Sequence, residues 1–225
     1  MESTVRESSP SLLLYLFADR FVPEKKFRSV GVEIPCRNVQ VKLEELAAGL
    51  FAVAFWSLRE QGIIGLEAFR ARRMLVVPTT RVRVSGLGSA PRPGLEGEIL
   101  KALGEKKEDH VYALVRRWFG TNSRSPHWDV VRVVIKEAMD LGYMSQKEEE
   151  TGRGAVTGFF LGKTRVKLEP SCEKISSLEG HLEEFASRWE NFQSSETELY
   201  GALLEQARKA INSRTESDSD YDFPN

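Results

Sequence analysis

A helical pattern that stops at a glycine and leads into strand-forming residues constrains the fold of this chain most. Between residues 41 and 62, apolar side chains recur at spacings of three and four, as in an amphipathic α-helix, and Gly62 supplies the stop. Residues 63–69 and 74–84 are rich in β-branched and apolar side chains and predict a hairpin. The apolar positions of the helix are Leu43, Leu46, Ala47, Leu50, Phe51, Ala54, Phe55 and Leu58.

The same order of elements recurs further along the chain. Helical patterns cover residues 95–103, 111–119 and 128–141. Gly142 ends the last of them, and residues 143–146 and 155–168 predict a second hairpin. Residues 41–170 are therefore expected to form two winged-helix-like units, in a chain that is mainly α with small β-hairpins.

The first forty residues are expected to pack against these units rather than cross a membrane. The apolar run at residues 12–17 is too short for a transmembrane helix. After it comes a proline-punctuated basic connection that contains Lys25, Lys26 and Arg28. Residues 1–40 are thus predicted to be a packed segment followed by a loop.

The C-terminal part has the pattern of a helical hairpin. Apolar residues alternate at spacings of three and four from residue 175 to residue 199, and a bend is expected near Glu196. We expect an acidic helical hairpin over residues 171–212 and a disordered acidic tail over residues 213–225. The helical seam either binds a partner helix or packs inside the chain. Its central residues are Leu178, Leu182, Phe185, Trp189 and Phe192.

Charge is distributed unevenly although the formal net charge of the chain is only −1. Thirteen acidic and five basic residues follow Leu168, which gives that segment a net charge of −8. The remaining twenty-seven basic and twenty acidic residues give residues 1–168 a net charge of +7. A basic body with an acidic extension favours an anionic partner for the body.

Arginines concentrate on the first predicted hairpin and its linker. They are Arg70, Arg72, Arg73, Arg81, Arg83 and Arg92. Guanidinium groups form bidentate hydrogen bonds with phosphate oxygens, so this cluster is a candidate site for a phospholipid headgroup or a nucleic-acid backbone. The alternative is a solvated hairpin that pairs with the acidic C-terminal segment of the same chain.

Three large apolar residues, Phe159, Phe160 and Leu161, stand between two glycines in the second hairpin. They are either a tip that inserts into a membrane interface or a partner's groove, or a buried strand of a small sheet. Basic residues follow directly at Lys163, Arg165 and Lys167, and they suit an anionic surface.

No pattern of a catalytic, cofactor or metal site stands out. The sequence has no phosphate loop ending in Lys-Ser/Thr, no His-Glu-x-x-His pair and no Gly-x-Ser-x-Gly elbow. Two cysteines, Cys36 and Cys172, cannot build a disulfide framework, and the three histidines stand alone. We therefore expect a non-catalytic protein with reduced cysteines and without a cofactor or metal.

Winged-helix units also occur in nucleic-acid-binding proteins, which makes DNA or RNA binding the alternative function. The helix in the recognition position carries Arg132 and Lys136. It also carries Asp129, Glu137 and Asp140, so its net charge is −1, which is unfavourable for reading a major groove.

The order of elements and several short stretches resemble the Golgi phosphoprotein 3 family over residues 41–168. The run from Leu58 to Ala68, LREQGIIGLEA, is similar to that family's helix, turn and strand, and Arg72 and Arg73 follow it. Trp118-Phe119-Gly120 and residues 133–144 also occur in the family's order, and Phe159 to Leu161 coincides with its hydrophobic hairpin.

The resemblance implies a peripheral adaptor that recognises a phosphoinositide on the cytosolic face of Golgi membranes. The family's lipid-contacting tryptophan aligns with Lys42. Its pocket arginines align with Phe51, Trp128 and Val131, and Arg132 is adjacent to the last of these. Lys42, Trp128 and Arg132 are therefore a candidate pocket in a rearranged form. We therefore expect a non-catalytic adaptor or assembly subunit in membrane trafficking. It would be cytoplasmic, peripheral on the Golgi or another endomembrane, and would bind anionic phospholipid and a protein partner.

Overall fold

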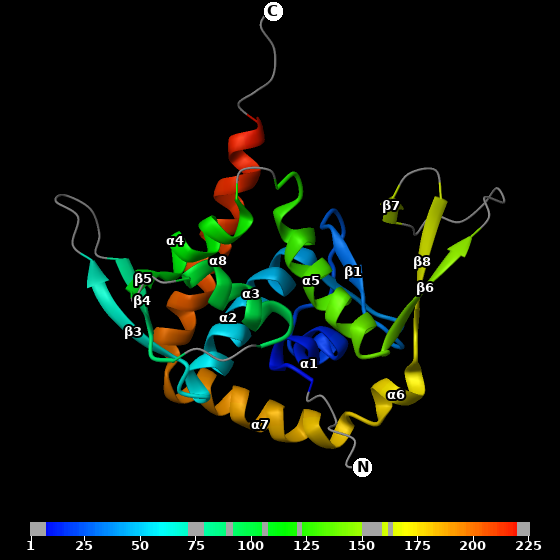
Figure 1. Cartoon of the computed structure of the whole chain (residues 1–225), viewed down its shortest axis with the longest axis horizontal. Coiled ribbons are helices and arrows are strands. Elements are labelled where there is room, and N and C mark those ends of the chain that lie inside the picture. Colours follow the sequence, from blue (N-terminus) through cyan, green and yellow to red (C-terminus); the bar gives the residue numbers. More distant parts are fainter. Residues whose placement is uncertain are drawn as a thin grey trace, which may run out of the picture.

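The fold is built around one long buried helix. A computed structural model of the chain describes residues 8–71, 79–88, 92–104, 108–120, 123–149, 159–161 and 164–219. Helix α2 (Leu43–Glu60) lies at the centre of the molecule, and most of its side chains are buried (Figure 1). Fully buried alanines at positions 47, 48, 52 and 54 let its neighbours approach closely. The helices that pack against it most extensively are α1 (Pro10–Leu16), α3 (Gly94–Leu103), α5 (Pro126–Asp140) and α8 (Thr197–Ser219).

The first predicted hairpin is present directly after α2. Gly62 ends the helix with a φ of +68°, a left-handed conformation that favours glycine. Strands β3 (Ile64–Ala71) and β4 (Thr79–Gly86) pair antiparallel, and β5 (Glu108–His110) adds a third strand beside β4. The sequence did not predict β5 because Glu-Asp-His has no apolar alternation.

The second predicted hairpin forms a sheet at the opposite end of the molecule (Figure 1). In the chain, α3 lies between β4 and β5 of the first sheet, and α4 (Val111–Phe119) and α5 lie between the two sheets. After Gly142, strands β6 (Met144–Glu149), β7 (Phe159–Leu161) and β8 (Thr164–Pro170) form an antiparallel sheet with β8 in the middle. The prediction of a mainly α chain with small hairpins is confirmed.

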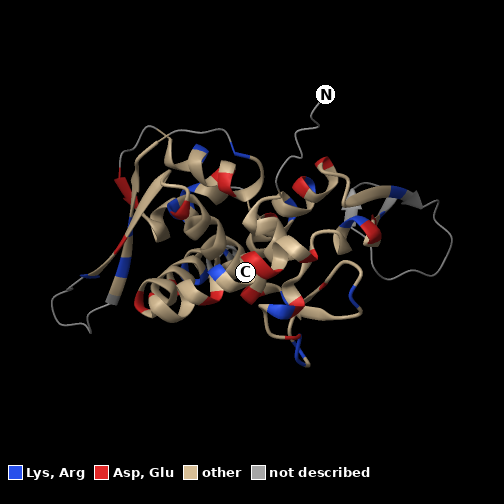
Figure 2. Cartoon of the chain, turned by 90° about the horizontal axis from the view of Figure 1, so that it is seen from below, with Lys and Arg blue, Asp and Glu red and all other residues tan. Residues whose placement is uncertain are grey.

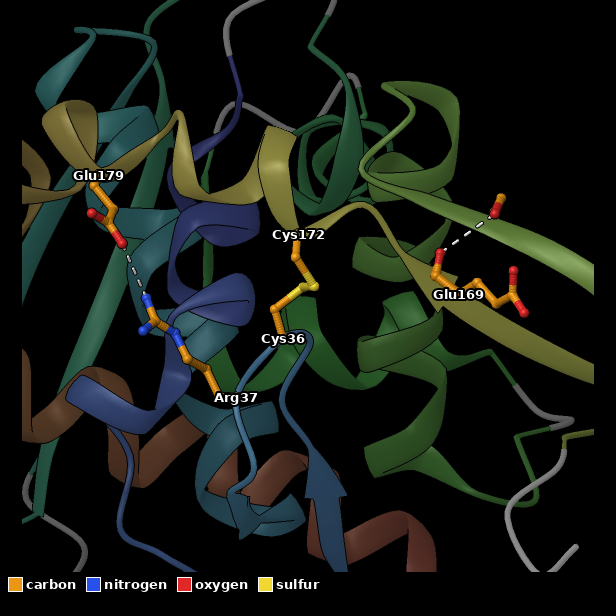
Figure 3. Close-up of a disulfide and its surroundings, with 6 residues drawn as sticks. Cys36, Arg37, Glu169, Cys172 and Glu179 are labelled. Carbon is orange, nitrogen blue, oxygen red and sulfur yellow. Dashed lines mark hydrogen bonds and ion pairs between the residues drawn. A yellow bond between two sulfur atoms is a disulfide. The ribbon is translucent and has the colours of Figure 1, made fainter.

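A disulfide bond joins the N-terminal segment to the C-terminal helices. Strands β1 (Gly31–Glu33) and β2 (Gln40–Lys42) form a small hairpin after α1 and the 3₁₀ helix η1 (Ala18–Arg20), and Cys36 lies in its loop. Cys36 is bonded to Cys172, the first residue of α6 (Cys172–Ser176) (Figure 3). The expectation of reduced cysteines is therefore wrong. The two residues are separated by 136 positions, and only the fold brings them together.

The C-terminal segment contains the predicted pair of helices after the short α6, but the second helix of the pair is longer than expected. Helix α7 (Glu179–Ser195) runs along the bottom of the view in Figure 1, and α8 follows it after a break at Glu196. Because α8 continues to Ser219, the predicted disordered tail from residue 213 begins too early. The Arg214 guanidinium donates to the carbonyl of Arg116 in α4 at 3.0 Å and holds this part of α8.

Candidate anionic-surface site

A tight turn before β1 presents an aromatic side chain between basic ones. The Ser29 backbone N–H and hydroxyl donate to the Lys26 carbonyl at 3.1 and 2.8 Å. Phe27 and Arg28 are therefore the central residues of a four-residue turn. Arg28 adopts a φ of 77°, a left-handed conformation that is strained for a residue other than glycine.

The stems of this turn are held to the body of the protein. The Lys25 backbone N–H donates to the Gln40 carbonyl at 2.7 Å, and the Lys42 N–H donates to the Pro23 carbonyl at 3.1 Å. The Leu43 N–H donates to the Val30 carbonyl at 3.1 Å. The turn is thus braced against β2 and the first residue of α2.

The tip of the turn is both apolar and positively charged. Phe27 is 93 % exposed and Val30 is 62 % exposed, which places them among the few large apolar side chains that the described surface leaves open. Lys25, Lys26 and Arg28 are exposed and form no ion pair with another described residue. Residues 24–30, here called the Phe27 turn, carry three basic side chains and one acidic side chain.

The first turn of α5 approaches the same end of α2 as the Phe27 turn. His127, in that first turn, interacts with Glu44 of α2 and with Asn212 of α8, and burial lowers the pKa of its imidazole. Trp128 is half-buried against the core, and the Arg132 guanidinium pairs with Asp129 at 2.6 Å. Lys42 is the residue before α2, and its backbone holds the Phe27 turn.

Acidic residues of the same chain pair with Arg83 and Arg70 of the predicted arginine cluster. The Arg83 guanidinium lies 2.7 Å from Glu108 and 3.5 Å from Glu67. Arg70 is largely exposed and lies 4.0 Å from Glu198 of α8. The Arg70–Glu198 pair agrees with the alternative of a solvated hairpin that pairs with the acidic C-terminal segment, whereas the two partners of Arg83 lie in β3 and β5. Arg72 and Arg73 lie outside the described residues, and Arg81 lines a cavity that is considered below.

Residues 159–161 form strand β7, which pairs only with β8 and lies at the edge of its sheet. This agrees, for the backbone, with the alternative of a strand rather than a free tip. The side chains of Phe159, Phe160 and Leu161 lie outside the described part of the chain, as do those of Lys163 and Arg165.

The helical seam of α7 is part of the chain's own core. Leu178, Leu182, Phe185, Trp189 and Phe192 are all buried. The ring centroids of Trp189 and Trp56 are 5.2 Å apart, and those of Trp189 and Tyr200 are 5.5 Å apart. Of the two alternatives for this seam, the structure shows internal packing and not a surface open to a partner helix, because α2 and α8 already cover these residues.

Two buried carboxylates hold the start of α1, and no pattern in the sequence predicts them. The Ser9 N–H and hydroxyl donate to Glu137 at 3.2 and 2.8 Å, and the Ser11 N–H and hydroxyl donate to Glu96 at 3.1 and 2.7 Å. Burial raises the pKa of both carboxyls, and with the added repulsion from Glu96 the pKa of Glu137 reaches about 7.

The Phe27 turn was also missed as a site. Its signal in the sequence is a phenylalanine inside the basic run KKFR, between Pro23 and Pro35. That run was predicted only as a basic connection, because exposure of an apolar side chain cannot be read from composition.

Searches against protein-family models, curated proteins and solved structures gave no match. Among the helices described, none is long and apolar enough to cross a bilayer. Within the same residues, no cluster of three or more His, Cys, Asp or Glu side chains has the arrangement of a metal site.

Proposed function

We propose that this protein is a non-catalytic peripheral adaptor that binds an anionic membrane surface through the Phe27 turn. The observation that carries the proposal is the phenylalanine exposed by 93 % at the tip of a braced, strained turn, beside three basic side chains that form no ion pair with another described residue. An aromatic ring that enters the acyl boundary while basic groups contact lipid phosphates is a usual form of interfacial binding.

The expected affinity of the turn alone is modest. Burying the Phe27 ring contributes ~2 kcal/mol, and each basic residue near an anionic surface adds roughly 1 kcal/mol. Together these give about 5 kcal/mol, which is a binding constant on the order of 10³ to 10⁴ M⁻¹. A single lipid chain gives a similar, reversible attachment, so stable residence needs a second contact. An adaptor obtains that contact from a protein partner.

The disulfide bears on where this binding occurs. Stable disulfides form mainly in oxidising compartments and at cell surfaces, and they are uncommon in reducing cytosol. The Cys36–Cys172 bond lies in the hairpin that continues from the Phe27 turn. We therefore assign the proposed binding to an anionic membrane surface in an oxidising environment, in place of the cytosolic face of the Golgi that the resemblance implies.

Nucleic-acid binding loses support at the helix in the recognition position. On α5, Lys136 pairs with Asp140 at 2.8 Å, and Arg132 pairs with Asp129. These pairs leave little free positive charge to meet a phosphate backbone.

Co-sedimentation with phosphatidylcholine vesicles, with and without phosphatidylserine, tests the proposal. We expect binding only to the anionic vesicles, weakened by added salt, and reduced roughly tenfold or more by Phe27→Ser or by Lys26→Glu. Leu87→Ser is the matched apolar control, because Leu87 is 66 % exposed but lies in the loop after β4. Lys101→Glu on α3 is the matched charge control.

Two results would reject the proposal. One is equal binding by the wild type and the Phe27→Ser variant at every salt concentration. The other is binding to random duplex DNA, with a steep dependence on salt, in the absence of binding to anionic vesicles.

A further inference from the structure

A second site lies away from the Phe27 turn, where β4, the start of α4 and the middle of α8 converge. A cavity of about 590 Å³ opens there, which is within the range of small-molecule sites. Figure 1 shows α4 and α8 beside the sheet of β3, β4 and β5. In Figure 2, the ribbon of this half of the molecule carries both basic and acidic positions.

The cavity contains a buried amide that the described protein does not satisfy. Gln206 of α8 is only 6 % exposed and lines the cavity. Both its Oε1 and its Nε2 are buried, and neither has a hydrogen-bond partner among the described residues. Buried polar atoms are nearly always hydrogen-bonded in folded proteins, so a donor and an acceptor from another molecule are expected here.

A helix N-terminus forms another wall of the same cavity. Tyr112 and Ala113, in the first turn of the nine-residue helix α4, line it. The residue before the helix, His110, makes no side-chain capping bond, and the first turn has no acidic residue. The amides of this turn have no partner within the helix, and the helix dipole favours an anion beside them.

Further donors stand at the lining. The His110 Nδ1 atom is buried and has no partner within the described chain, and its ring lies 5.4 Å from that of Phe69. Arg81 and Lys209 also line the cavity, together with one carboxylate, Glu205, which pairs with Lys209 at 2.5 Å. Two cations against one anion leave the cavity favourable for negative charge.

We propose that this cavity binds a small soluble phosphomonoester. Its phosphate would lie at the N-terminus of α4, where several donors converge, and three phosphate oxygens suit such a set better than a carboxylate does. The Gln206 amide would accept from and donate to the organic part, either a sugar hydroxyl pair or the edge of a nucleobase.

Calorimetric titration of the full-length protein at constant ionic strength tests this assignment. The probes are AMP, ribose 5-phosphate, inorganic phosphate, adenosine and citrate. AMP or ribose 5-phosphate should bind at least tenfold more tightly than inorganic phosphate, adenosine and citrate. Gln206→Leu should weaken that binding at least tenfold and still give a folded protein, because the change removes unsatisfied polar atoms. Lys209→Ala should weaken it several-fold, and Lys136→Ala, another lysine paired four residues away, should leave it unchanged.

Several results would overturn the assignment. They are the absence of phosphomonoester binding, equal binding of citrate, and unchanged affinity in Gln206→Leu, the last of which would mean that the Gln206 amide does not contact the ligand. The headgroup of phosphatidic acid is also a phosphomonoester. Vesicles that contain phosphatidic acid are therefore tested with the Phe27→Ser variant. Binding to those vesicles without binding to AMP or ribose 5-phosphate would also overturn the soluble ligand.

Discussion

The buried carboxylate of Glu137 should make the stability of this protein depend on pH in an unusual direction. In the folded protein the pKa of Glu137 is about 7, against the ordinary value of 4.5 expected after unfolding. Burial is the main cause, and the neighbouring Glu96 carboxylate adds repulsion. The folded protein therefore binds this proton more tightly than the unfolded chain does.

The sign and size of the effect follow from proton linkage. A group with a raised folded pKa stabilises the fold fully below its unfolded pKa, and that contribution is lost as the pH rises through the folded value. A shift from 4.5 to about 7 corresponds to about 3 kcal/mol. Stability should therefore fall by about this amount, from this group alone, between pH 4.5 and a pH above 7.

Urea unfolding of the wild type and of Glu137→Gln across this pH range tests the reasoning. The amide is neutral throughout and keeps an acceptor for Ser9, so the variant lacks this dependence. The difference in unfolding free energy between the two proteins should change by about 3 kcal/mol, in favour of the variant at the higher pH. Glu173→Gln, at an exposed acid in α6, is the control and should track the wild type.

A constant difference between the wild type and Glu137→Gln across the whole range would refute the reasoning. Should the variant fail to fold, titration of the carboxyl carbons of the wild type by NMR answers the same question. An ordinary titration midpoint for Glu137 would contradict the role of burial.

Three further changes should alter stability in ways that the contacts specify. Gly94→Ala should lower the free energy of unfolding in urea by about 2 to 4 kcal/mol, because the added Cβ would lie 1.9 Å from Glu137 Oε2 and the φ of Gly94 is +62°. Gly88→Ala is the control and should be neutral, because the space around Gly88 is open. Cys36→Ser should lower the free energy of unfolding by roughly 2 to 5 kcal/mol. A reductant should lower the free energy of unfolding of the wild type by a similar amount. An unfolding midpoint that the reductant leaves unchanged would contradict the disulfide. Trp189→Ala should cost about 3 to 5 kcal/mol in thermal or urea unfolding, since it empties the centre of the α7 packing.

The sequence predicts the helices and hairpins of this fold well because their signals are local. The pattern of residues 41–62 specifies α2, and Gly62 and Gly142 mark the ends of helices that lead into strands. Strand β5 escaped prediction because three polar residues become a strand only through pairing with β4.

The candidate sites depend on contacts that a sequence does not display. Glu137 meets Ser9 across 128 positions, and Gln206 is notable only because it is buried without a partner. The repeating pattern in α7 predicts an apolar face, but it does not distinguish a partner's helix from α2 and α8 of the same chain. Basic composition identified the arginine hairpin, whereas the fold pairs Arg83 with acids and leaves the basic side chains of the Phe27 turn without an ion pair to another described residue.

The Cys36–Cys172 bond closes a covalent ring that contains both helix and hairpin units. A single protease cut within the ring leaves one molecule, whose two pieces separate only after reduction. The Phe27 turn and helix α1 lie outside the ring, and their only covalent connection to it is the backbone. A cut at Lys25 or Lys26 would therefore leave the fragment that contains α1 attached only by noncovalent contacts, among them the hydrogen bonds of Ser9 and Ser11 to the two buried glutamates and the ion pair of Arg20 with Glu183.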